Sequence, residues 1–135
     1  RQVVADFYNE GILGDCQIDL DIKESAEHMQ IEGDKEMLCR AFQNLIGNSI
    51  RYAPGSLIQI RVYREGKWLR IDFWDTGPGI PPEVAAIVEG RMEDPSIHVM
   101  GLRVVRQIIR AHKGQMRFLS KGGKRNEVCL FLPLS

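Results

Sequence analysis

The sequence predicts one α/β domain of two layers, in which about three helices cover one face of a mixed sheet of about five strands. Segments that alternate apolar and polar residues indicate half-buried strands, and segments with apolar residues at helical spacing indicate amphipathic helices. The chain has 135 residues, which is enough for one hydrophobic core and too few for two comfortable domains. Residues 1–135 are therefore expected to form a single domain.

One helix and two strands are expected in the first third of the chain. Residues 1–10 carry apolar side chains at helical spacing, and Gly11 is suited to end this helix. Residues 17–22 alternate between polar and apolar side chains, which predicts a strand. Residues 29–33 are a second, shorter strand candidate.

A long helix and a β-hairpin are expected next. Asp34 is suited to cap the helix, because its side chain can accept hydrogen bonds from the first free backbone amides. The helix should reach about Ala53, since Pro54 cannot continue it. Residues 57–63 and 68–75 alternate again and predict two strands joined by a turn.

The C-terminal part is expected to add one helix and two strands. Residues 101–112 are strongly amphipathic, and Gly114 follows where the helix should stop. Residues 115–120 and 127–133 predict the last two strands. Residues 82–89 are a candidate for a further short helix.

Composition and charge exclude several classes of protein. Hydrophobic residues make up 44% and charged residues 27% of the chain, as in soluble globular domains. The balanced charge, with 18 basic and 18 acidic residues, argues against general binding of nucleic acid. No apolar run approaches the roughly 20 residues of a membrane span. The three cysteines are scattered, which favours free thiols in a reducing compartment.

Asp75 ends a predicted strand and is followed by two spaced glycines. Because side chains alternate along a strand, Asp75 shares the face of Ile71 and Phe73 and should point toward the covering helices. A buried carboxylate is costly unless it is paired or hydrogen-bonded. Gly77 and Gly79 allow another molecule to come close, so the pattern suits a flat ligand with an amino group, such as adenine. A turn onto its own loop amides is the alternative.

The long predicted helix carries a polar stripe beside its apolar face. Asn44, Asn48, Arg51 and Tyr52 share this stripe when residues are placed at about 100° intervals. Amide oxygens suit Mg²⁺, an arginine can meet phosphate oxygens, and a tyrosine ring can lie against a base or ribose. An ordinary polar helix face is the alternative. Because an amide cannot act as a base, the stripe lacks a catalytic base for hydrolysis.

Four segments together resemble the ATP-binding domain of bacterial sensor histidine kinases. Residues 44–53 (NLIGNSIRYA) resemble the N box and residues 75–80 (DTGPGI) the first glycine box. Residues 100–114 resemble the second glycine box with its helix, and residues 127–134 the last strand. Their order and spacing match over residues 17–134. The resemblance implies a Bergerat (GHKL) fold, with ATP and Mg²⁺ held between helices and sheet.

The resemblance also implies a role for each matching residue. Asp75 would accept a hydrogen bond from the adenine amino group, and Asn48 with Asn44 would hold Mg²⁺ against the phosphates. The other implied nucleotide-binding residues are Arg51, Tyr52, Gly77, Gly79, Ile80, Gly101 and Leu102. No catalytic residue is expected, because none of the histidines is followed by the acidic residue of the family's phosphoacceptor site.

Two departures from the family pattern leave an alternative function open. The ATP lid is shortened to about twenty residues, and Val99 replaces the first glycine of the second glycine box. We therefore expect a mobile lid over residues 83–99 and nucleotide binding weakened by roughly 10- to 100-fold. The alternative is a degenerate pseudokinase domain with weak or no ATP turnover, which acts as an interaction module.

The expected parent protein is a two-component sensor kinase. Residues 1–14 are interpreted as the remnant of a connection to a helical dimerisation and phosphoacceptor domain, which would receive the γ-phosphoryl group of ATP. The expected partners are that domain and a response regulator, without nucleic acid. The chain itself should be monomeric and its parent homodimeric. The expected location is cytoplasmic, with an inner-membrane anchor in the parent as an open alternative.

Overall fold

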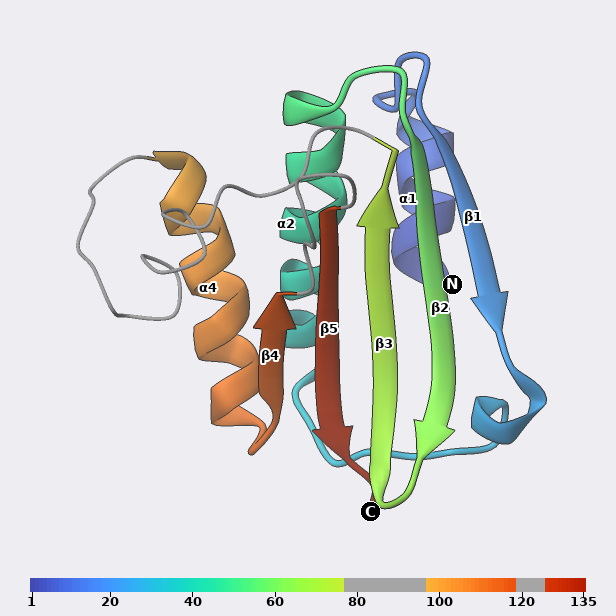
Figure 1. Cartoon of the computed structure of the whole chain (residues 1–135), viewed down its shortest axis with the longest axis vertical. Helices are drawn as coiled ribbons and strands as arrows, with labels where there is room; N and C mark the ends of the chain where they lie inside the picture. Colours follow the sequence, from blue (N-terminus) through green and yellow to red (C-terminus); the bar gives the residue numbers. More distant parts are fainter. Residues whose placement is uncertain (77–96, 119–125) are drawn as a thin grey trace.

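The computed structural model describes residues 1–76, 97–118 and 126–135, with the backbone alone at residues 52, 97–100 and 126. One mixed sheet carries its five strands in the order β1-β2-β3-β5-β4, and the helices lie on one side of it (Figure 1). The parallel pair is β1 (Gln17–Ile22) with β2 (Leu57–Glu65). The antiparallel neighbours are β2 with β3 (Trp68–Asp75), β3 with β5 (Asn126–Pro133), and β5 with β4 (Gln115–Phe118). The predicted two-layer α/β fold is confirmed.

Each helix begins or ends at a residue suited to that position. The first helix, α1 (Gln2–Glu10), ends at Gly11, whose φ of 66° is left-handed. The long helix α2 (Lys35–Tyr52) begins after Asp34, whose carboxylate accepts from the backbone N–H of Met37 at 3.2 Å. Helix α4 (Ile97–Ala111) is followed two residues later by Lys113, which takes the left-handed conformation expected of a glycine. A short 3-10 helix, η1 (Glu24–Ala26), follows β1.

The predicted strand over residues 29–33 is wrong. This segment runs past the end of the sheet toward α2 (Figure 1) and belongs to no strand. The carbonyl oxygen of Gln30 accepts from the backbone N–H of Ser135 at 3.0 Å and from its hydroxyl at 2.9 Å. Its hydrogen bonds therefore tie the segment to the C-terminal residue instead of to a neighbouring strand.

The hydrophobic core fills the space between the sheet and the helices. Phe42 of α2 stacks on Phe73 of β3 with 6.0 Å between ring centroids. The large aliphatic side chains that are fully buried are Ile46, Ile58, Val105, Ile109, Leu130 and Leu132. They come from α2, β2, α4 and β5, so the core joins both layers. Within the described part of the chain, no helix is long and apolar enough to cross a membrane.

The outer face of the sheet is covered by its own long side chains. The guanidinium of Arg70 lies 5.4 Å from the ring centre of Tyr63 and 5.3 Å from that of Phe131. Asp72 accepts from Arg70 Nε at 2.9 Å and from the Tyr63 hydroxyl at 3.1 Å. Asp72 is consequently only 4% exposed, although it points away from the helices.

Candidate functional site

Asp75 lies at the end of β3 and points toward α2, as predicted. Its side chain is 2% exposed. Its oxygen Oδ2 accepts a hydrogen bond from the hydroxyl of Ser49 at 2.8 Å. Because Ile71 and Phe73 occupy the same face of β3, the alternation of the strand places this carboxylate at the rim of the core.

Asn48 lies against α4, one residue before Ser49. A Cβ added to Gly101 would lie 3.5 Å from both the oxygen and the nitrogen of the Asn48 amide, so the bare glycine backbone forms one wall around this side chain. The amide nitrogen of Asn48 is buried and has no hydrogen-bond partner among the described residues. Such an atom is costly unless a further acceptor meets it. The donor set therefore fits a ligand that brings acceptor oxygens to Asn48.

The other predicted positions fall into three groups. Asn44 is partly buried on α2, one turn before Asn48, and Arg51 is exposed in the last turn. Leu102 is 4% exposed and belongs to the hydrophobic core. The remaining positions lie outside the described residues or have undescribed side chains; they are Tyr52, Gly77, Gly79, Ile80, the predicted lid with Val99, and the predicted short helix over 82–89.

His112 joins α4 to α2 at the end of both helices that lies away from Asn48. Its ring nitrogen Nε2 accepts from the backbone N–H of Asp34 at 2.9 Å. Its Nδ1 lies 2.7 Å from the carbonyl oxygen of Ile108, to which it donates in the tautomer that these two partners assign. An added Cβ at Gly33 would lie 2.6 Å from this ring, so the contact requires the neighbouring glycine. The two helices that border the candidate site are thus joined by this hydrogen bond at the end opposite Asn48.

Ser49 is the site residue that the sequence reasoning missed. At about 100° per residue it falls on the apolar face of α2, so the polar stripe did not include it. A usable signal was present, however. Because Asp75 was predicted to point inward, it required a donor, and a hydroxyl on the covering helix is a suitable one.

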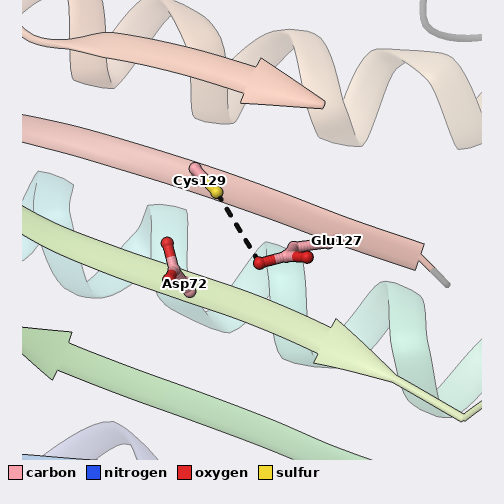
Figure 2. Close-up of side chains that lie close together, drawn as sticks. All are labelled: Asp72, Glu127 and Cys129. Carbon is pink, nitrogen blue, oxygen red and sulfur yellow. Dashed lines mark hydrogen bonds between the residues drawn. The ribbon is translucent and has the colours of Figure 1, made fainter. Parts of the chain in front are cut away.

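A second cluster of polar side chains lies on the outer face of the sheet. Ligand atoms of Asp72, Glu127 and Cys129 lie within 4.8 Å of one another (Figure 2). The Cys129 thiol contacts a carboxylate oxygen of Glu127 at 3.9 Å, and Asp72 already accepts from Arg70 and Tyr63. Burial, followed by the hydrogen bond and the charge of Asp72, raises the pKa of Cys129 to about 12. Metal ligation requires the thiolate, so this cluster is better explained as a structural network.

An apolar cavity of about 180 Å³ lies between α1, α2 and the sheet. Val4, Cys39, Phe42 and Val62 contribute to its lining, whose described members include no carboxylate. The described lining of the cavity therefore offers no carboxylate that could take the place of Asp75.

A family model matches most of the chain. Residues 33–135 match the family described as histidine kinase-, DNA gyrase B- and HSP90-like ATPase. This range contains Asn48, Ser49, Asp75 and Gly101, which form the site described above.

Curated relatives are sensory kinases. The chain is 31% identical over 125 residues to the sensor-like histidine kinase SenX3 of Mycobacterium tuberculosis, covering 85% of this chain and 30% of that protein. It is 35% identical over 94 residues to the adaptive-response sensory kinase SasA of Gloeothece citriformis, covering 64% of this chain and 24% of that protein. The chain thus spans less than a third of the length of these relatives.

Solved histidine kinase structures share the fold. The catalytic domain of histidine kinase ThkA superposes with a TM-score of 0.80 at 20% identity, covering 98% of this chain and 88% of that one. Full-length ShkA in complex with AMPPNP superposes with a TM-score of 0.80 at 20% identity, covering 100% of this chain and 29% of that one. Histidine kinase AdeS of Acinetobacter baumannii superposes with a TM-score of 0.77 at 22% identity, covering 99% of this chain and 62% of that one. The chain therefore belongs to the histidine kinase-, DNA gyrase B- and HSP90-like ATPase family and has the fold of a histidine kinase catalytic domain.

Proposed function

We propose that this chain binds Mg-ATP and donates the γ-phosphoryl group to a histidine on a separate domain of a longer sensor kinase. The observation that carries the proposal is Asp75, a carboxylate that is 2% exposed and directed at α2 beside Asn48. In this assignment Asp75 accepts from the adenine amino group. The structure of the relative ShkA with AMPPNP, an ATP analogue, supports a nucleotide in this fold.

Asn48 and Asn44 are the proposed contacts to Mg²⁺ and phosphate. An amide oxygen is a hard ligand that Mg²⁺ accepts beside its water molecules. The buried amide nitrogen of Asn48, which lacks a partner among the described residues, suits a phosphate oxygen. Gly101 lies in the second turn of α4, where its missing side chain would leave room for the phosphates beside Asn48. Phosphoryl transfer depends mainly on such positioning and charge neutralisation.

A thermal-shift assay with ATP, with and without Mg²⁺, tests nucleotide binding. ATP at a hundred times its dissociation constant should stabilise the fold by about 2.7 kcal/mol. Asp75→Asn should abolish the shift, and Asn48→Ala should remove its dependence on Mg²⁺. Asp72→Asn is the matched control, because it makes the same change on the outer face of the same strand and should keep the shift. No shift at millimolar ATP would reject the proposal.

The phosphoacceptor and the partners are proposed from the relatives. Because sensory kinases are the curated matches, we infer that the parent protein supplies a dimerising helical domain with the acceptor histidine and signals to a response regulator. A cytoplasmic position for this domain follows from that proposal. The chain alone should hydrolyse ATP slowly, since position 44 carries an asparagine in place of a base. Incubation of the full-length parent with labelled ATP should produce phosphohistidine, which is labile to acid. A parent that binds nucleotide but forms no phosphohistidine would be a pseudokinase.

A further inference from the structure

The hydrogen bond between Ser49 and Asp75 has a defined direction. An ionised carboxylate only accepts hydrogen bonds, so the shared hydrogen comes from the hydroxyl of Ser49. The distance of 2.8 Å is normal for a well-formed O–H···O bond. Because Asp75 is 2% exposed, water competes little for this interaction.

The bond also determines what the pair offers to a third molecule. A carboxylate has about four lone-pair positions and a hydroxyl oxygen two, so Asp75 can accept from Ser49 and from other donors at once. While Ser49 donates to Asp75, neither side chain has a hydrogen left to give. The pair therefore presents acceptors only. An exocyclic amino group satisfies such a pair, whereas an exocyclic oxygen meets it acceptor to acceptor.

The same bond contributes to the orientation of the carboxylate. The last torsion of an aspartate side chain has a broad minimum, so packing alone defines the plane of its oxygens poorly. Ser49 is held by α2, whose start is joined to α4 through Asp34 and His112. The hydroxyl is thus a fixed point for one of the two oxygens of Asp75.

We propose that Ser49 is a positioning residue that makes Asp75 select nucleotides with an amino group over nucleotides without one. This inference deepens the proposed nucleotide-binding function and rests on it. Ser49 acts through Asp75, so its loss should reduce the preference for the amino group instead of nucleotide binding in general.

Isothermal titration calorimetry with two diphosphates measures this preference. ADP carries the amino group, and purine riboside diphosphate has hydrogen in its place. Ser49→Ala should weaken ADP binding about tenfold, because the carboxylate that accepts from the amino group loses a hydrogen bond that orients it. Binding of purine riboside diphosphate should change less than about threefold. Ser49→Thr, which keeps the hydroxyl, should retain the wild-type preference.

Ser56→Ala is the matched control. Ser56 is a buried serine, at 7% exposure, and its hydroxyl has no hydrogen-bond partner among the described residues. Its removal should leave both affinities within about twofold of wild type. If Ser49→Ala does not fold, Ser49→Cys makes the same test, because a thiol is similar in shape and only a weak donor.

The outcomes separate the two proposals. If the wild-type chain binds neither diphosphate, the proposed function fails and this inference fails with it. If the wild type binds ADP but Ser49→Ala lowers the affinity for both diphosphates equally, only the role of Ser49 is overturned. The same holds if Ser49→Ala changes neither affinity. A loss confined to ADP supports it.

Discussion

Adding one methyl group at Gly114 should destabilise the domain far more than adding one at Gly47. A Cβ at Gly114 would meet the carbonyl oxygen of Phe131 far inside van der Waals contact and Cγ2 of Ile109 at 2.9 Å. Phe131 belongs to an interior strand and Ile109 is fully buried, so neither can move aside easily. Overpacking of a core typically costs about 1–3 kcal/mol, and Gly114→Ala should reach about 3 kcal/mol.

The control substitution should have the opposite sign. Among the described residues, nothing lies within 4 Å of a Cβ at Gly47, which sits inside α2. Gly47→Ala should therefore raise the free energy of unfolding by about 0.5–1 kcal/mol through better helix propensity. Urea unfolding followed by circular dichroism measures both changes. A cost below about 1 kcal/mol for Gly114→Ala would refute the close approach between the end of α4 and β5.

Three further predictions concern a helix cap, a buried thiol and a partly exposed one. Asp34→Ala should lower the free energy of unfolding by about 1 kcal/mol, because Met37 loses its capping acceptor; Lys35→Ala is the control, and equal effects in urea unfolding would contradict the cap. Burial raises the pKa of Cys129 from 9.0 to about 12, so the unfolded chain loses this proton first as the pH rises. The free energy of unfolding should therefore fall above pH 9 by up to roughly 1 kcal/mol per pH unit. Measured from pH 9 to 10, it should fall less steeply in Cys129→Ala. Cys39 lines the apolar cavity and is partly exposed, so a thiol reagent with mass spectrometry should find it modified well before Cys129; equal rates would refute the burial of Cys129.

The sequence predicted correctly those helices and strands whose alternation or capping residues match their place in the fold. Strand alternation placed Asp75 on the inner face, and the cap at Asp34 located the start of α2. The strand expected at residues 29–33 failed, because a short apolar alternation does not reveal whether a sheet edge is available.

Interactions between distant segments could not be predicted from those patterns. Asp72 lies on the opposite face of β3 from Asp75, and its burial depends on Arg70 and Tyr63 folding over it. The bond from Ser49 to Asp75 likewise joins residues 26 positions apart. Residue type suggested a donor for Asp75, but only the packing of α2 against β3 identified which one.

The position of β5 has a consequence for synthesis on the ribosome. It is the latest strand of this chain to be translated, yet it lies inside the sheet between β3 and β4. Because β3 and β4 both pair with β5, each lacks this partner until β5 has been translated and released. A nascent chain that stops before these eight residues leaves the inner edge of β3 open, where another copy can pair with it.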